Sequence, residues 1–257
     1  MKIIKSCAVA VIAAFAGVAA HAAEGEKASV SWVFNDVVAP AEQAAYESAI
    51  KNFNKCLSQH GSKFAWVAYT HETGDTYKYS YVAGPVTWAD IDTMHAANKD
   101  CQSVWRNEGN AHLKSETASF LVAQPELSRM PSAKDPQPAL INVTYFTLKG
   151  ASGSDDAFTD GVKKIVAGAE KTKWSAHFVV YKVRGGDKGA PDYILVAPYK
   201  NFAEYGVGFN PPVWKMLEAA NGKADAEAAR KQINDAIEEA SSHVNSYSAE
   251  LTYTPAK

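Results

Sequence analysis

Two stretches of the chain share one layout, and this repetition limits the folds that the sequence can adopt. Trp66–Pro85 and Trp174–Pro198 each read as a strand, a glycine-containing turn and a second strand, and each closes on a small residue followed by proline. Alternating runs rich in β-branched and aromatic residues, joined by a glycine turn, are typical of β-hairpins. A layout that recurs at a long interval indicates that one structural unit has been duplicated.

The segments around the two hairpins also follow one order. Apolar periodicity predicts a strand and a helix before each hairpin, and a helical region and a strand after it. The expected elements are strand 28–38, helix 41–59, hairpin 63–83, helical region 87–110 and strand 115–123, then strand 139–149, helix 156–171, hairpin 173–197, helical region 201–240 and strand 245–254. The chain therefore divides into a first repeat (28–124), a proline-rich linker (125–138) and a second repeat (139–255).

Strand, helix, hairpin, helix and strand in this order make up the ferredoxin-like βαββαβ unit. Two such units in one chain resemble the dimeric α+β barrel superfamily in its tandem, fused form, and the resemblance covers residues 28–254 without pointing to a subfamily. It implies an α+β fold in which two sheets pair into one barrel with helices outside. Members include cofactor-less monooxygenases, haem-binding enzymes and proteins without an assigned role, so the fold alone selects no activity.

The first residues have the layout of a secretory signal peptide. Lys2 and Lys5 precede an apolar run, and Ala20-His21-Ala22 offers the small-x-small pattern of a cleavage site. The run is shorter than the roughly 20 residues that a membrane-spanning helix needs. We therefore predict a signal peptide at residues 1–22, cleavage near Ala22/Ala23, and a periplasmic or secreted protein.

The charge of the mature chain excludes one class of partner. Loss of Lys2 and Lys5 with the signal peptide changes the formal net charge from -2 to -4, and no basic run remains. A mildly acidic chain without a basic patch argues against nucleic-acid binding. No later apolar stretch is long enough to predict a membrane span in the mature chain, and the sequence does not indicate an oligomeric state.

Two cysteines remain after export, and they predict a disulfide between Cys56 and Cys101. An even pair of cysteines in an oxidising compartment most simply forms a disulfide. A redox pair or a metal site is the alternative, but the chain has no C-x-x-C spacing. Asp90, Asp92 and His95 lie close in sequence and fit the polar face of a helix, so no metal site is predicted.

Aromatic and histidine side chains on the hairpins are the candidates for ligand binding. Period-2 alternation places Tyr69 and His71 on one strand face, and His177 lies on the matching strand of the second hairpin. If this face points into the barrel, the three residues line a cavity between the repeats. A histidine held on a solvated sheet surface is the alternative.

A row of tyrosines forms the second candidate group. Tyr77, Tyr79 and Tyr81 alternate along one strand, so they share a face and could bind a flat ligand. Packing of these rings beneath a helix is the alternative.

The leading functional hypothesis is an exported α+β protein that binds a small apolar or aromatic molecule between its two repeats. The alternatives are an enzyme of the barrel superfamily, with a cofactor-less or a haem-dependent oxygenase activity, and an interaction module of the cell envelope. Catalysis and cofactor stay open, because haem is possible for the superfamily but no residue pattern indicates it.

Overall fold

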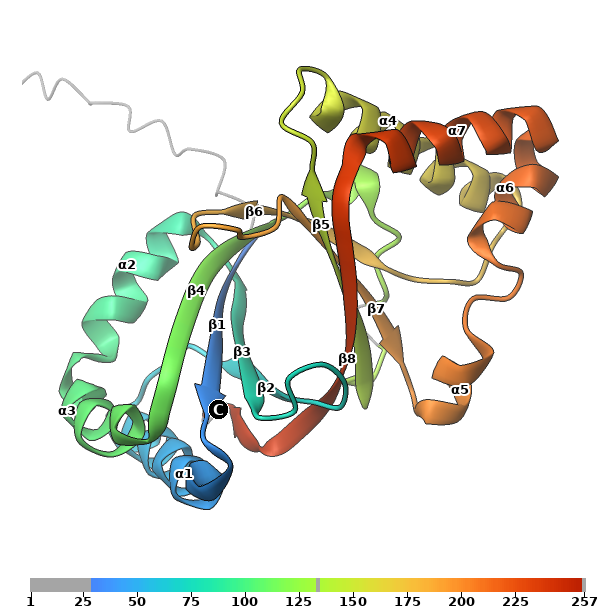
Figure 1. Cartoon of the computed structure of the whole chain (residues 1–257). Helices are drawn as coiled ribbons and strands as arrows, with labels where there is room; N and C mark the ends of the chain where they lie inside the picture. The colour runs from blue at the N-terminus through green and yellow to red at the C-terminus, as the bar shows by residue number, and fades with distance from the viewer. Residues whose placement is uncertain (1–28, 133–134, 256–257) are drawn as a thin grey trace, which may run out of the picture.

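The computed structural model describes residues 29–132 and 135–255, so the predicted signal peptide lies outside the described residues. Within this part of the chain, eight strands close into one antiparallel barrel in the order β1-β3-β2-β8-β5-β7-β6-β4 (Figure 1). The strands are β1 (Val30–Val38), β2 (Trp66–His71), β3 (Lys78–Val86), β4 (Leu113–Ala123), β5 (Leu140–Leu148), β6 (Val179–Arg184), β7 (Tyr193–Tyr199) and β8 (Ile237–Tyr253). The helices are α1 (Gln43–Gln59), α2 (Trp88–Ala97), α3 (Gln102–Val104), α4 (Ser154–Lys171), α5 (Phe202–Val207), α6 (Val213–Asn221) and α7 (Lys223–Ala236).

The barrel closes because each repeat pairs its last strand with the other repeat. Strand β4 pairs with β1 of its own repeat and with β6 of the second repeat. Strand β8 pairs with β5 of its own repeat and with β2 of the first. Helices α1 to α3 cover the first repeat and α4, α6 and α7 the second (Figure 1). The predicted fold, two βαββαβ repeats forming one α+β barrel, is confirmed.

Two predicted element boundaries are wrong. Helix α7 ends at Ala236, and β8 begins at once, because the segment predicted to continue the helix pairs with β5 through Ile237 and Ala240. Strand β6 begins only at Val179. The segment before it forms a single bridge to Arg129, whose guanidinium donates hydrogen bonds to the carbonyls of Trp174 and Ala176 and so replaces a neighbouring strand.

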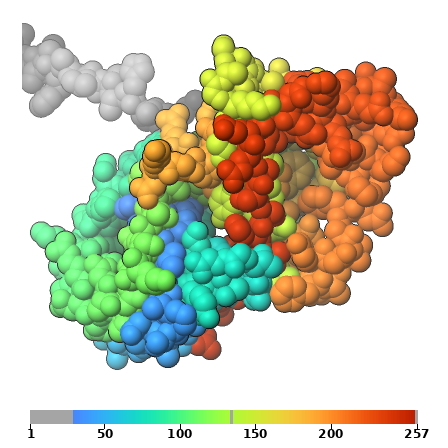
Figure 2. Space-filling view, in the orientation of Figure 1, coloured from blue at the N-terminus to red at the C-terminus, as the bar shows by residue number. Residues whose placement is uncertain are grey.

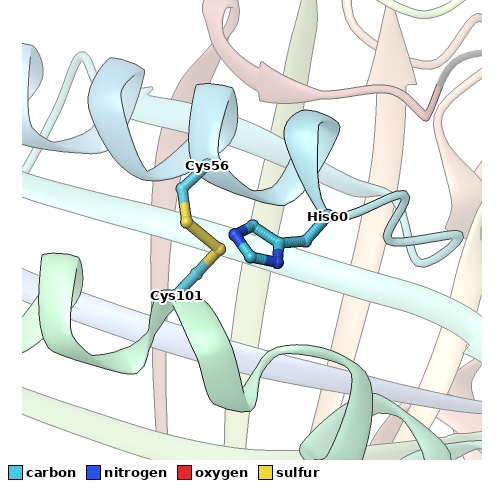
Figure 3. Close-up of side chains that lie close together, drawn as sticks. All are labelled: Cys56, His60 and Cys101. Atoms are coloured by element: carbon cyan, nitrogen blue, oxygen red, sulfur yellow. A yellow bond between two sulfur atoms is a disulfide. The ribbon is translucent and has the colours of Figure 1, made fainter.

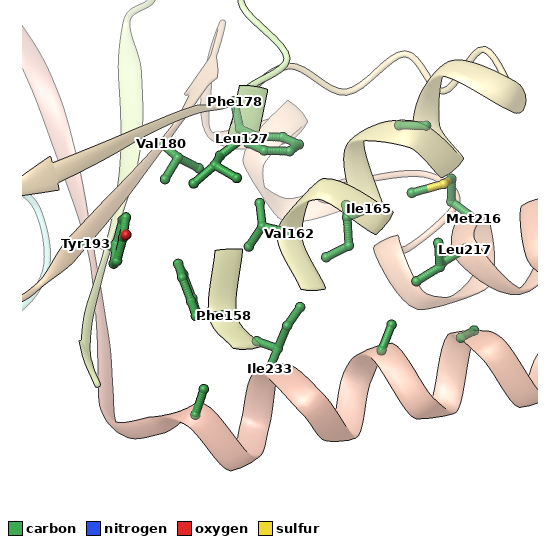
Figure 4. Packing of buried hydrophobic residues seen from close by; sticks show 14 of the residues in the cluster. Leu127, Phe158, Val162, Ile165, Phe178, Val180, Tyr193, Met216, Leu217 and Ile233 are labelled. Carbon is green, nitrogen blue, oxygen red and sulfur yellow. The ribbon is translucent and has the colours of Figure 1, made fainter. Parts of the chain in front are cut away.

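The helices of the second repeat pack closely against one another above their sheet. Two glycines of α4 allow this close approach: a Cβ on Gly161 would lie 2.3 Å from Ile233 of α7, and one on Gly168 would lie 2.8 Å from Leu217 of α6. Large apolar side chains fill the remaining volume (Figure 4). They include Phe158, Val162, Ile165, Trp174, Phe178, Tyr193, Met216, Leu217 and Ile233. The space between sheet and helices in this repeat is therefore a core.

In the first repeat, Thr87 caps the start of α2. Thr87 Oγ1 accepts a hydrogen bond from the Asp90 amide at 3.2 Å, and Asp90 Oδ2 accepts one from the Thr87 amide at 2.8 Å. This reciprocal pair satisfies two amides that a helix start leaves free. It fixes the direction in which α2 leaves the sheet. None of the helices in the described part of the chain is long and apolar enough to cross a membrane.

Candidate functional site

Two cavities lie on opposite faces of the first-repeat strands. The barrel cavity, about 490 Å³, is lined by inward-facing side chains from both repeats. The helix-side pocket, about 530 Å³, lies between the outer face of the first-repeat strands and helices α1 to α3. Successive residues of a strand point to opposite faces, so β1 serves both cavities. Val33 and Asn35 line the barrel cavity. Trp32, Phe34 and Asp36 line the helix-side pocket.

The walls of the helix-side pocket are mainly aromatic. Its aromatic lining residues are Trp32, Phe34, Phe53, Trp66, Tyr81 and Trp105. Phe53 of α1 stacks on Trp66 of β2, with ring centroids 5.7 Å apart and planes inclined by 15°. Trp105, which follows α3, lies 5.8 Å from the Phe53 ring. Several flat apolar surfaces facing one space suit a flat, aromatic ligand.

A buried carboxyl group lies in the inner wall of this pocket. Asp36 is 1% exposed, and its Oδ2 accepts a hydrogen bond from the Tyr46 hydroxyl at 2.5 Å. Its Oδ1 has no hydrogen-bond partner among the described residues. Glu116 lies directly opposite Asp36 in the β1–β4 register and also lines the pocket. An unpaired buried acceptor is costly, so Oδ1 is suited to a ligand that donates a hydrogen bond.

The two carboxyl groups hold a proton at higher pH than ordinary acids do. Burial raises the pKa of Asp36 to about 7; the Tyr46 hydrogen bond opposes this rise, and the charge of Glu116 adds to it. Burial also raises the pKa of Glu116, and the neighbouring Asp36 carboxyl opposes that rise. Like charges held close together cannot both ionise easily. The pair can therefore take up or release a proton near neutral pH, which is what a general acid or base requires.

The outer rim of the pocket is cationic and polar. His95, Lys99 and Arg106 line it, and all three are exposed. The His95 ring packs against Trp32, with centroids 4.9 Å apart. The pocket thus has a cationic mouth, aromatic walls and an acidic inner end.

A disulfide joins two walls of the helix-side pocket. Cys56 lies on α1 and Cys101 in the turn before α3, with Cα atoms 5.8 Å apart, and His60 lies beside them (Figure 3). The predicted disulfide is confirmed. Because the two sulfurs are bonded to each other, they offer no thiolates to a metal ion. The bridge instead holds the α1 wall, which carries Phe53, against the turn that carries Lys99.

The lining of the barrel cavity is mixed, with a polar group and an aliphatic group of side chains. Strands β1, β3 and β8 contribute the polar group, Asn35, Lys78, Ser80, Ser241, His243 and Asn245, together with Val33 and Val82. Strands β4, β5 and β7 contribute the aliphatic group, Leu121, Ile141, Val143, Ile194 and Val196, with the hydroxyls of Thr117, Ser119 and Thr147 beside it. Its mouth is the recess between β4 (green) and β8 (red) in Figure 2, beside the loop 186–191.

A buried histidine lies behind the polar group of side chains. His71 is 5% exposed, and its Nε2 lies 2.9 Å from Ser80 Oγ, whose proton is donated to Asn35 Oδ1 at 2.7 Å. The His71 Nε2 is therefore the donor to Ser80. Burial lowers the pKa of His71 to about 4, and the nearby positive charges of Lys78 and His243 lower it further. The imidazole is neutral at neutral pH.

No family model matches the chain, and no curated protein matches it in sequence. Solved structures do match it. An anthrone oxidase-like protein superposes with a TM-score of 0.56 at 12% identity, over 90% of this chain and 95% of that one. A mutant chlorite dismutase from Candidatus Nitrospira defluvii superposes with a TM-score of 0.52 at 11% identity, over 86% of this chain and 92% of that one. The chain is a tandem dimeric α+β barrel. At these identities the likeness shows the fold alone.

Haem is the cofactor that the resemblance stated above makes possible, but the residues that line the two cavities do not fit it. The inner walls of both cavities carry an unpaired acceptor, Asp36 Oδ1 in one and Asn245 Oδ1 in the other. Iron-bound porphyrin has no ring N–H to donate, so it would leave these acceptors unpaired. Of the imidazoles near the cavities, His71 is bound to Ser80, His95 packs on Trp32, and His243 packs between the rings of His71 and Tyr145.

The structure separates the side chains that the sequence grouped as ligand-binding candidates. Tyr69 and His71 point into the barrel, and Gln137 donates a hydrogen bond to the Tyr69 hydroxyl at 3.1 Å. His177 does not join them. It precedes β6, is exposed, and lies 3.2 Å from the Met130 carbonyl oxygen.

The three tyrosines of the predicted row do not all lie together. Tyr79 and Tyr81 share a face as predicted, but this face points away from the barrel towards Tyr46 of α1. Tyr81 lines the helix-side pocket, and Tyr79 donates a hydrogen bond to Glu47 at 2.9 Å. Tyr77 precedes β3 and is 40% exposed.

Sequence reasoning missed the groups that define both cavities: Asp36, Glu116, Asn35, His243 and Asn245. One signal was present. Trp32, Phe34 and Asp36 alternate along one strand, so a charged residue continues an aromatic face. A carboxyl group on such a face is either buried or at the edge of a pocket.

Proposed function

We propose that this protein is an exported enzyme that binds a small aromatic molecule in the helix-side pocket and removes a proton from it. The observation that carries the proposal is Asp36, a buried carboxyl group with a pKa of about 7 and one unpaired oxygen at the inner end of an aromatic pocket. Export rests on the predicted signal peptide. The sequence hypothesis also had the protein bind an aromatic molecule, but placed it between the two repeats. We now place this molecule outside the barrel wall, in the helix-side pocket.

The proton transfer follows from the groups in the pocket. The ligand lies between aromatic walls, with its acidic O–H or C–H group at Asp36 Oδ1. The carboxylate accepts this proton and becomes a carboxylic acid, while Tyr46 keeps its hydrogen bond to Oδ2 and fixes the orientation of the group. Glu116, opposite Asp36, is the group to which the proton can pass next. The ligand is left as an electron-rich aromatic anion beside the cationic groups of Lys99 and Arg106.

An oxidation of the bound anion by dioxygen is the reaction class that we favour. Cofactor-less oxygenases of this superfamily need a substrate anion that reacts with dioxygen directly, and the pocket can generate one. The structural likeness to an anthrone oxidase-like protein supports a hydroxylated or carbonyl-bearing polycyclic aromatic substrate. Anthrone itself is a suitable probe: with one dioxygen it gives anthraquinone and one water, so atoms and electrons balance.

Binding and catalysis are tested with separate probes. 1-Naphthol carries a hydrogen-bond donor and 1-methoxynaphthalene does not, so the pocket should bind 1-naphthol roughly ten-fold more tightly, as expected for a hydrogen bond to a charged group. Calorimetry in two buffers of different ionisation enthalpy near pH 7 should detect proton exchange on binding. Asp36→Asn should abolish both effects, whereas Asp160→Asn, at an exposed position of α4, should change neither.

Catalysis is measured as dioxygen consumption with anthrone, above the uncatalysed rate and dependent on Asp36. If the protein binds anthrone but consumes no dioxygen, its function is that of a carrier. Equal affinity of the two naphthalene probes in the wild type would contradict the assigned role of Asp36. A Soret band on addition of haemin, lost in His95→Ala, would overturn the conclusion that haem does not fit.

A further inference from the structure

The barrel cavity is a second space, separated from the helix-side pocket by the first-repeat strands. Its inward-facing side chains come from both repeats, and the described part of the chain leaves about 490 Å³ between them. A closed barrel of this size has room for one small ligand. The proposed enzymatic role of Asp36 makes no use of this space.

One buried polar atom in the cavity wall has no hydrogen-bond partner among the described residues, and this indicates which ligands the cavity can bind. Asn245 is 2% exposed and lines the cavity, and its Oδ1 has no hydrogen-bond partner among the described residues. Leaving a buried acceptor unpaired costs about 1–3 kcal/mol. Such a group calls for an explanation, and a ligand donor in the adjoining cavity would supply the missing partner.

The surroundings of Asn245 favour a neutral donor. His71, its partner in the β2–β8 register, is neutral at neutral pH, because burial lowers its pKa to about 4. Burial raises the pKa of Tyr145, also in the cavity wall, to about 12, so its hydroxyl keeps its proton. The charged side chains of the lining, Lys78, Lys188, Asp187 and Glu239, include both signs, so the cavity gives neither a carboxylate nor an ammonium head a uniformly opposite charge.

The aliphatic part of the cavity lining indicates that the rest of the ligand is apolar. Leu121, Ile141, Val143, Ile194 and Val196 form an aliphatic surface without a polar atom in their side chains. Burying an aliphatic chain against such a surface contributes about 0.8 kcal/mol for each CH₂ group. Tyr69 of β2 and Tyr145 of β5 also line the cavity.

We propose that the barrel cavity binds a neutral, aliphatic molecule whose head group carries an N–H or O–H donor, such as a medium-chain primary amide or alcohol. The donor binds Asn245 Oδ1, and the aliphatic chain lies along the wall formed by β4, β5 and β7. The ligand enters through the recess between β4 and β8 (Figure 2). This site is independent of the helix-side pocket and of the reaction proposed there.

The test compares three probes of equal chain length by isothermal titration calorimetry: octanamide, methyl octanoate and sodium octanoate. Octanamide should bind, and methyl octanoate, which lacks a donor, should bind roughly ten-fold more weakly. Octanoate should bind more weakly than octanamide because its head group is an anionic acceptor. Equal binding of all three probes, or tighter binding of octanoate, would overturn the assigned role of Asn245.

Two variants locate the site. Asn245→Leu replaces the amide by an apolar group of similar size; it should lower octanamide affinity about ten-fold and leave methyl octanoate unchanged. Val143→Phe should fill the cavity and weaken both probes. Asp36→Asn, in the other pocket, should affect neither.

Folding is checked separately. Asn245→Leu removes an unpaired buried acceptor, so its melting temperature should equal or exceed that of the wild type. Unchanged octanamide affinity in a folded Val143→Phe variant would place binding elsewhere and end the proposal. Absence of octanamide binding to the wild type would end it as well.

Discussion

Asp36 and His71 are buried titratable residues whose pKa values move in opposite directions. The pKa of Asp36 rises from 3.8 to about 7, so between these values the native state holds a proton that the unfolded chain has lost. Stability therefore falls as pH rises through this window. The pKa of His71 falls from 6.5 to about 4, so here the unfolded chain holds the extra proton, and stability falls as pH decreases.

Single variants should separate these two contributions. Asp36→Asn is expected to show a free energy of unfolding that rises from pH 4 to 6.5, because the effect of His71 then acts without opposition. His71→Gln is expected to show the reverse trend, a fall from pH 4 to 7. Denaturant titrations at a series of pH values provide the measurement. Parallel profiles for the two variants would show that neither burial effect operates.

Alternation along a strand predicts which residues share a face, but not which face is inside. It grouped Tyr69 with His71 correctly, and Tyr79 with Tyr81 correctly. The barrel wall is covered on both sides, by cavity residues within and by helices outside. Both faces are therefore largely apolar, and no difference in polarity marks the inward one. His177 was misplaced for another reason, since its segment pairs through Arg129 instead of forming a strand.

At the scale of elements, the disulfide is the strongest local constraint on the helix-side pocket. Cys56 and Cys101 are 45 residues apart in sequence, and a loop of that length corresponds to about 4 kcal/mol in the chain-entropy model. The double variant Cys56→Ser, Cys101→Ser should lose stability of this order in denaturant unfolding. A loss below about 1 kcal/mol would contradict the entropic estimate.

The same variant should affect the two cavities differently. It frees the turn that carries Lys99 from α1, so 1-naphthol binding in the helix-side pocket should weaken. Octanamide binding in the barrel cavity should stay at the wild-type level, because no residue of this turn lines that cavity. Equal loss of both would indicate general unfolding.

The elements themselves were largely predictable, and their ends were less so. Helix α1 and the cap of α2 at Thr87 follow from apolar spacing and capping chemistry. The start of β8 does not, because the residues after Ala236 have good helix propensity and become a strand through pairing with β5. Contacts distant in sequence decided that boundary.

At the scale of the whole molecule, each repeat completes the sheet of the other. Without the second repeat, β2 and β4 would each have an unpaired edge, since their partners β8 and β6 belong to that repeat. Unpaired edges promote association with another chain. A fragment of residues 28–124 is therefore expected to form a dimer or larger assembly, as measured by light scattering. A folded monomer would show that the repeat is self-sufficient.

The tandem barrel could be predicted from the order of elements, whereas the cavities could not. The two repeats have the same layout, yet one holds a pocket between sheet and helices and the other a filled core. In the second repeat, Gly161 and Gly168 let α7 and α6 pack close to α4, and single glycines in a helical pattern carry no signal of what they face.

Strand β1 separates the barrel cavity from the helix-side pocket. Asn35 and Asp36 are covalent neighbours, yet one faces the barrel cavity and the other the helix-side pocket. A ligand that moves this strand on one side alters the geometry on the other. Any such influence must be reciprocal: the factor by which an amide in the barrel changes affinity for an aromatic molecule outside equals the factor in the opposite direction. Because the two proposed sites are independent, we expect this factor to be close to one in both directions.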